Sequence, residues 1–265
     1  MRPELFHIGG VSFGAYRTLL TVAFITGTLL TVREAGRRGD CGALSPMAGG
    51  WGFLGAILGA KAFYIVQYDS PWHVWRAFLL WGGGLVYYGG LAGGVAAVAV
   101  YLRIRRIPLV KALDIMAVYL PLGQAITRVG CFLNGCCYGT ESSLPWAVRF
   151  PPGSVAFAKH VNAGLVDPAA GHSLTVHPAQ LYMVAGLLIV FAVAKVVLHR
   201  KQHDGAVLFT YLLLYGVLRF FVEFVRGDNA RSVAHLTVYQ VISLGLIVGG
   251  GAALLWLRRR PPREA

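Results

Sequence analysis

The sequence predicts an all-α integral membrane protein with about seven transmembrane helices, and two observations lead to this fold class. The chain of 265 residues is 56% hydrophobic and only 13% charged, with a mean hydropathy of +0.61. Soluble domains are about 45–50% apolar and about 25% charged. The apolar residues also form continuous runs, whereas barrel strands alternate over segments of ~10 residues. We therefore predict membrane-spanning helices.

Each predicted span is an apolar run close to the ~20 residues that a helix needs to cross the hydrocarbon core. Arg17 lies in the first run and Lys61 in the second, and glycine and polar residues interrupt the third and fourth. The spans are 12–32, 47–67, 84–102, 112–134, 178–198, 206–226 and 237–257. Together they form a single polytopic domain over residues 1–265. The segment at about 139–177 is too polar and too rich in Pro and Gly to span.

The net charge of +13 is concentrated in four basic clusters between spans or at the C-terminus. They are Arg33/Arg37/Arg38, Arg103/Arg105/Arg106/Lys111, Arg200/Lys201 and Arg258/Arg259/Arg260/Arg263. With seven spans, all four lie on one side, which the positive-inside rule makes cytoplasmic. The N-terminus and segment 139–177 are then extracytoplasmic, and the C-terminus is cytoplasmic. Topology and attraction to anionic headgroups explain the charge, so we expect no nucleic-acid partner.

A charged stripe interrupts the apolar sixth span. Tyr215, Arg219, Glu223 and Arg226 are separated by steps of four, four and three, so they share one helix face. A lone Arg at mid-bilayer costs at least ~2.5–3.5 kcal/mol, so this face is expected to line the bundle interior or a wet cavity. A structural ion pair, with Arg226 extending to the headgroups, is the alternative.

Further polar residues are predicted at a similar depth in other spans: Tyr16, Arg17, Lys61, Arg128 and Gln240. Several cations that converge on one membrane cavity favour an anionic ligand. The planar guanidinium suits phosphate, and the abundant phosphate in a membrane is the phospholipid headgroup. The residues therefore predict a site for an anionic phospholipid that enters from the bilayer.

Several motifs in order resemble one family, the bacterial prolipoprotein diacylglyceryl transferases. "YGVLRFFVEFVR" (215–226) resembles its Tyr-Gly-x-x-Arg-x-x-x-Glu-x-x-Arg segment, and "LDIMAVYLPLGQAITRVGCFLNGCCYG" (113–139) its Arg-x-Gly-Asn-Phe-x-Asn-Gly signature. "IGGVSFGAYRTLLTVAF" is similar to the first helix and "GFLGAILGAKAFYIVQY" to the second, while "WGGGLVYYGGLAGG" resembles a Phe-His-Gly-Gly segment. "WAVRFPPGS" and "VHPAQLY", which contains His177, match two further landmarks.

The resemblance implies transfer of the diacylglyceryl group of phosphatidylglycerol to the lipobox cysteine of an exported prolipoprotein, with release of glycerol phosphate. It implies a multi-pass protein of the bacterial cytoplasmic (inner) membrane, and we expect no cofactor or metal. Arg128 and Arg219 would stabilise the leaving phosphate, and Glu223 would orient Arg219. Tyr16 and Tyr88 complete the expected catalytic set. The residues expected to bind substrate are Arg226, Lys61, Asn134, Gly135, Gly139, His177, Cys131, Gly89 and Gly90.

Four positions depart from the family pattern: Tyr88 replaces a histidine, Cys131 an asparagine, Cys136 an acidic residue and Met183 a glutamate. The change to Tyr88 matters most for the reaction, because an acceptor thiol with a pKa near 8.5 attacks as its thiolate and must first lose its proton. Tyr88 would act as base if a guanidinium stabilised its phenolate. Otherwise it hydrogen-bonds substrate while His177 or water takes the proton, or it is an interfacial aromatic residue.

Cys131, Cys136 and Cys137 allow four interpretations that the sequence leaves open. These are a disulfide on the oxidising side, small buried thiols, a metal site without typical zinc spacing, and a transient lipid carrier. Five other histidines are expected to be solvated: His7, His73, His160, His172 and His235.

Two other functions remain open from the sequence. A divergent transferase could use the same lipid donor with a different acceptor. A non-catalytic phospholipid-binding or transport protein could retain the arginine cavity without a base.

Overall fold

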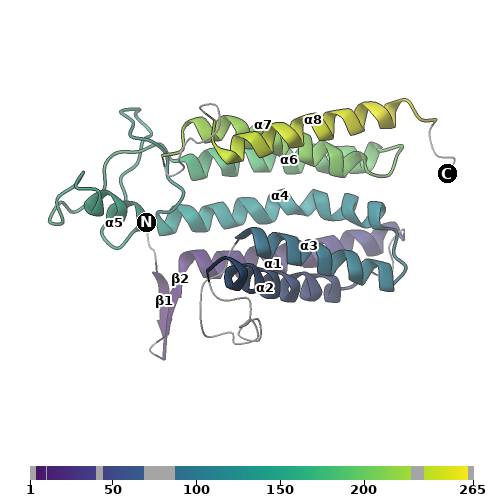
Figure 1. The fold of residues 1–265 in the computed structure, drawn as a ribbon, viewed down its shortest axis with the longest axis horizontal. Helices are drawn as coiled ribbons and strands as arrows, with labels where there is room; N and C mark the ends of the chain where they lie inside the picture. Colours follow the sequence, from purple (N-terminus) through teal and green to yellow (C-terminus); the bar gives the residue numbers. More distant parts are fainter. Residues whose placement is uncertain (1–3, 10, 40–43, 69–86, 228–235, 262–265) are drawn as a thin grey trace. The chain divides into compact units, whose positions relative to one another are not determined.

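The structure is a computed structural model that describes residues 4–9, 11–39, 44–68, 87–227 and 236–261. The described chain is mainly helical, which confirms the all-α membrane class (Figure 1). Among the described residues, six helices are long and apolar enough to cross a membrane: α1 (Ala15–Arg38), α2 (within it Pro46–Val66), α4 (Leu109–Asn134), α6 (Ala179–Arg200), α7 (Ala206–Phe224) and α8 (Val238–Arg258). The third predicted span corresponds to α3 (Tyr87–Ile104), whose described apolar part, Gly89–Ile104, is shorter.

The N-terminus begins with a short hairpin rather than with the first span. β1 (Glu4–Ile8) pairs antiparallel with β2 (Val11–Gly14), and the rings of Phe6 and Phe13 stack with centroids 4.9 Å apart. α1 therefore starts at Ala15 rather than at residue 12. Strands of four and five residues are too short to recognise in the sequence beside the apolar run that follows.

The chain divides into two compact units, 28–115 and the remainder, and the boundary falls within α1 and α4. In unit 28–115, α2 (Pro46–Tyr68) packs against α3 through glycines. A Cβ on Gly59 would lie 2.8 Å from the Gly93 Cα atom, so the two backbones approach as they do in small-xxx-small contacts. Gly89 lies against Gly59 and Phe63, and a Cβ on Gly90 would lie 3.2 Å from the Ala56 carbonyl oxygen. The predicted Gly89 and Gly90 thus have a packing function within this unit.

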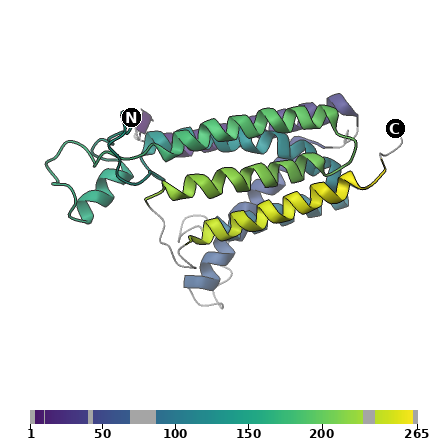
Figure 2. The same ribbon diagram turned by 90° about the horizontal axis from the view of Figure 1, so that it is seen from above.

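In the other unit, α7 packs between α6 and α8, and Figures 1 and 2 both show these three helices side by side. α6 supplies Met183 and Leu187, which are buried with Ala125 of α4 and Val222 of α7. This packing places α7 between neighbouring helices, with Arg219 and Glu223 buried.

The segment between α4 and α6 folds around its own small core of Tyr138, Phe150, Ala156 and Val176. It contains α5 (Val155–Asn162), whose N-cap Ser154 accepts a hydrogen bond from the Phe157 N–H. His160 of α5 is buried, so the expectation that it is solvated is wrong. It lies four residues after the buried Ala156 on one helix face, and its ring meets the Tyr138 ring edge-on at 5.1 Å.

Candidate functional site

The charged stripe of α7 forms a buried ion pair. The Arg219 Nη1 atom lies 2.7 Å from the Glu223 Oε2 atom, and the two side chains are 7% and 0% exposed. An i,i+4 spacing places both side chains on one face. The apolar residues beside them, Leu218 and Val222, pack into the helix interface. The charged face of α7 therefore lies inside the helix bundle, as the periodicity predicts.

The N-terminus of α8 supplies partners that the sequence analysis missed. The Thr237 hydroxyl donates a hydrogen bond to Glu223 Oε1 at 2.9 Å, and the Tyr239 ring centroid lies 4.8 Å from the Arg219 Cζ atom. Thr237 and Gln240 also form a capping box at the start of α8. The Thr-Val-Tyr-Gln sequence is a recognisable capping signal, but it does not reveal that the threonine would orient a carboxylate on another helix.

A backbone bridge brings Arg226 to the end of α4. α7 ends at Phe224 rather than at residue 226, and Arg226 then pairs with Gly139 in an antiparallel bridge. The Thr140 N–H donates to the Val225 carbonyl at 2.8 Å, and Arg226 Nε lies 3.9 Å from Glu223 Oε2. A Cβ on Gly139 would lie 2.7 Å from the Val225 carbonyl oxygen, so this junction accepts only glycine without a backbone shift.

Arg128 of α4 joins the same group of charges. Its electrostatic neighbours include Cys131, Cys137, Tyr215 and Arg226. Arg219 has electrostatic interactions with the same Tyr215 and Arg226, and with Arg128. The structure therefore brings guanidinium groups from α4 and from the end of α7 into one cluster.

Tyr16 lies at the start of α1 beside α4. A Cβ on Gly130 would lie 3.2 Å from the Tyr16 Cα atom, so the absent side chain lets the two helices approach. The Tyr16 hydroxyl has Arg128 and the three nearby cysteines as electrostatic neighbours. This predicted residue thus borders the arginine cluster.

The end of α4 has the hydrogen bonds of a Schellman motif. The Cys136 N–H donates to the Cys131 carbonyl at 3.1 Å and the Gly135 N–H to the Phe132 carbonyl at 3.2 Å. Gly135 has a φ of +72°, a left-handed conformation that favours glycine. Asn134 is the last residue of α4, and the Cys136 thiol lies 3.8 Å from the Cys131 carbonyl oxygen. This turn directs the chain back toward Arg128.

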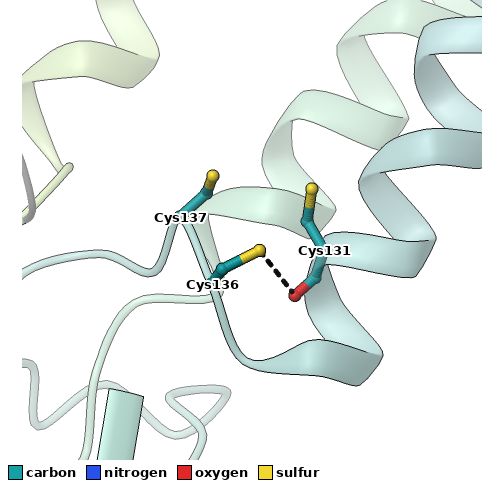
Figure 3. A group of neighbouring side chains, drawn as sticks. All are labelled: Cys131, Cys136 and Cys137. Carbon is teal, nitrogen blue, oxygen red and sulfur yellow. Dashed lines mark hydrogen bonds between the residues drawn. The ribbon is translucent and has the colours of Figure 1, made fainter. Parts of the chain in front are cut away.

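Cys131, Cys136 and Cys137 are free thiols in the structure. Their Sγ atoms all lie within 4.8 Å of one another. Figure 3 shows the three side chains at the turn after α4. The neighbouring Cys131 and Cys136 thiols lower the pKa of Cys137, and Arg128 and Arg226 lower it further. The thiol group thus borders the arginine cluster.

His177 lies in the segment before α6. Its Nδ1 atom is 3.1 Å from the Tyr182 hydroxyl, which accepts a hydrogen bond from Trp146 Nε1 at 2.8 Å. Its carbonyl accepts the Gly139 N–H at 2.9 Å. The backbone of His177 therefore supports the junction that positions Arg226.

Three predicted site residues lie in the unit 28–115. Lys61 of α2 is buried, with 4% of its surface exposed, and Gly89 and Gly90 lie in α3. The Tyr88 side chain lies outside the described residues. Contacts between substrate and these four residues stay predictions.

The arrangement can bind an anion and stabilise added negative charge. Two guanidinium groups, from Arg219 and Arg226, lie against the Glu223 carboxylate, and Arg128 is an electrostatic neighbour of Arg219 and Arg226. Positive charge is therefore in excess within this cluster. Guanidinium groups bind phosphate oxygens through parallel N–H donors, and burial strengthens the interaction.

Comparison with known proteins agrees with this chemistry. The family model described as prolipoprotein diacylglyceryl transferase matches residues 3–256. Three relatives named phosphatidylglycerol–prolipoprotein diacylglyceryl transferase cover almost the whole chain. That of Gloeobacter violaceus is 32% identical over 99% of this chain and 95% of its own length. Those of Clostridium tetani (30% over 94% and 95%) and Citrobacter koseri (27% over 99% and 95%) are similarly related. These matches confirm the resemblance, and the chain belongs to the prolipoprotein diacylglyceryl transferase family.

Proposed function

We propose that this protein transfers the diacylglyceryl group of phosphatidylglycerol to the lipobox cysteine of an exported prolipoprotein in the bacterial cytoplasmic membrane. The observation that carries the proposal is the cluster in which Arg219 and Arg226 lie against the buried Glu223 carboxylate, with Arg128 as their electrostatic neighbour. The cluster adjoins the folded segment between α4 and α6 through the Gly139–Arg226 bridge. The proposal places this segment outside the cytoplasm, where it would admit the preprotein.

The arginines would act on the leaving group. The acceptor sulfur attacks a glycerol carbon, the carbon–oxygen bond to phosphate breaks, and the phosphate keeps the bonding electrons. Negative charge then grows on the phosphate oxygens, where Arg128 and Arg219 would stabilise it. The buried contacts of Glu223 with Arg219 and of Thr237 with Glu223 support an orienting function for the carboxylate.

The remaining predicted residues would position the substrates. Arg226 would bind the headgroup, and Tyr16 and Asn134 would hold polar groups of the lipid. Gly135 and Gly139 allow the backbone to turn beside the cluster. Tyr88 would bind substrate or accept the thiol proton.

The decisive experiment uses purified protein, labelled phosphatidylglycerol and a peptide with a lipobox cysteine. We expect lipidated peptide and released glycerol phosphate in equal amounts, and no product from the peptide with Ser in place of Cys. Headgroup release without peptide lipidation would indicate a different acceptor. Lipid binding without turnover would indicate a non-catalytic protein.

Variants of the cluster test the assigned residues. Arg128→Ala and Arg219→Ala are expected to lower transfer at least ~100-fold, since loss of one preorganised donor costs about 10²–10³ in rate. Arg219→Lys keeps the charge but loses the planar fork, so it should also be strongly impaired. Arg200→Ala, at the exposed end of α6, is the matched control. Near-normal turnover in Arg128→Ala or Arg219→Ala would contradict their assignment.

A further inference from the structure

Three thiols converge at the turn that follows α4. Cys131 is buried on the last turn of the helix, and Cys136 and Cys137 follow it in the loop. Their Sγ atoms all lie within 4.8 Å of one another, and Figure 3 shows the three side chains gathered on one side of the turn. Three neighbouring soft donors are an uncommon concentration in a chain with four cysteines.

The backbone holds these thiols in place. The Schellman hydrogen bonds fix Cys136 against Cys131, and the Cys136 thiol contacts the Cys131 carbonyl at 3.8 Å. The fully buried Gln180 donates from Nε2 to the Cys136 carbonyl at 2.8 Å. Cys137 has a φ of +60°, which is uncommon for a residue with a Cβ. Conformations of this kind persist where the surrounding contacts enforce them, and they cluster at functional sites.

We propose that Cys131, Cys136 and Cys137 bind one soft metal ion, with Zn²⁺ as the expected occupant. Thiolates select Zn²⁺ and Cu⁺ over Mg²⁺ and Ca²⁺. With Zn–S bonds of about 2.3 Å, neighbouring sulfurs in a tetrahedral site lie about 3.8 Å apart. The present separations of up to 4.8 Å therefore need to shorten by about 1 Å at most, within reach of side-chain rotation.

The surrounding charge suits this occupant. Three thiolates and one Zn²⁺ carry one net negative charge. Arg128 and Arg226 act electrostatically on Cys137 and would offset that charge. The hydrogen bond from Gln180 to the Cys136 carbonyl fixes the loop, as hydrogen bonds to the outer side of metal ligands do in metal sites.

Three protein ligands leave the fourth position of a tetrahedral Zn²⁺ open, which is typical of catalytic rather than structural zinc sites. Resting on the proposed function, we assign this position to the acceptor thiol of the preprotein. A thiol that coordinates a metal is deprotonated, so its proton passes to water and its sulfur keeps an electron pair. That pair forms the bond to the glycerol carbon, while the phosphate leaves with the electrons of the broken carbon–oxygen bond. Arg128 stands beside Cys131 and Cys137, where the phosphate would be bound.

Metal binding is tested without reference to activity. Reduced, purified full-length protein is titrated with Zn²⁺ against a chromophoric chelator, and with Cd²⁺ while the ultraviolet thiolate-to-metal absorption is recorded. One ion per chain is expected, with binding lost in Cys131→Ser and Cys137→Ser. Cys41→Ser is the matched control and should bind normally. Thermal unfolding of each variant checks that the fold is retained.

Two results would overturn the metal site: no thiol-dependent absorption in the reduced protein, or equal binding by wild type and Cys137→Ser. A third contrary result comes from mass spectrometry of protein isolated without reductant. It would be a disulfide within the cluster, in a protein that still binds no metal after reduction.

Activity then tests the fourth ligand separately. Chelation should lower peptide lipidation, and added Zn²⁺ should restore it in wild type but not in Cys137→Ser. Lipidation that survives complete removal of a bound metal would refute the assignment of the acceptor thiol. Absence of lipidation in metal-loaded wild type would instead contradict the proposed function, while the titration result stands by itself.

Discussion

At the scale of single residues, the Glu223 carboxylate links the charges of the candidate site. It lies against Arg219 and Arg226 and accepts a hydrogen bond from Thr237. A carboxylate without exposed surface depends on such partners, because an uncompensated buried charge is expensive. The orientation of the Arg219 guanidinium therefore depends, through Glu223, on a threonine of another helix.

Thr237→Val keeps the shape of the side chain and removes its hydroxyl. A hydrogen bond to a charged group contributes about 1.5–3 kcal/mol, so we expect lipid transfer to fall roughly tenfold or more. Loss of the N-cap should also lower the free energy of unfolding by about 1 kcal/mol. Kinetics with labelled phosphatidylglycerol measure the first effect and thermal unfolding the second. Thr237→Ser retains the hydroxyl and should stay close to wild type. Equal activity of the two variants would disprove the orienting function.

His160 should make stability depend on pH. Burial lowers the pKa of its imidazole, with Glu141 opposing the shift. Its Nδ1 atom accepts the Leu174 N–H at 3.3 Å. Because the folded pKa lies below the unfolded value of about 6.5, the unfolded chain binds the proton more readily. The contribution of neutral His160 to the free energy of unfolding is therefore complete above the unfolded pKa. It decreases as the pH falls from the unfolded pKa toward the folded one.

The measurement compares the unfolding midpoints of wild type and His160→Asn at pH 8 and pH 5. Asparagine retains a hydrogen-bond acceptor but does not titrate. The wild-type midpoint should decrease more on acidification than that of the variant. Identical decreases would show that His160 does not titrate on unfolding.

At the scale of elements, the Gly139–Arg226 bridge joins the end of α4 to the end of α7. The Gly139 N–H donates to the His177 carbonyl, so the start of α6 meets the same point. Glycine is required there because a Cβ would meet His177 and the Val225 carbonyl oxygen. The loop geometry thus fixes Arg226 beside Glu223.

Gly139→Ala should disturb this junction. A Cβ would lie 2.7 Å from the Val225 oxygen and 2.8 Å from the His177 oxygen, so backbone has to move. Overpacking of this kind costs about 1–3 kcal/mol, and we expect a lower unfolding midpoint together with reduced transfer. In Gly171→Ala a Cβ meets no atom within 4 Å, which makes it the control. A Gly139→Ala protein with wild-type stability and activity would show that the junction tolerates a side chain.

At the scale of the whole molecule, the topology remains a prediction from the basic clusters. It places α5 outside the cytoplasm and the turn between α6 and α7 inside. With the four native cysteines changed to Ser, Lys159→Cys should react with a membrane-impermeant maleimide in intact cells. Gln202→Cys should react only after the cells are permeabilised. The reverse labelling pattern would invert the orientation.

Much of the fold could be predicted because spans are encoded locally. The predicted end of the fourth span, residue 134, coincides with the end of α4, and the predicted start at residue 206 with that of α7. The β1–β2 hairpin and α5 were not predicted, since each is too short to give a reliable periodic signal in the sequence. The burial of His160 was missed for a related reason: it depends on a tertiary contact with Tyr138.

The sequence by itself determined the membrane class, the approximate spans and the shared face of Arg219 and Glu223, because composition and helical periodicity are local properties. Only the tertiary structure decided that Thr237 would hold Glu223 and that Arg226 would lie beside Gly139. These contacts join residues on different helices and loops. Their geometry depends on how the intervening backbone turns and packs, which no local pattern of residue types specifies.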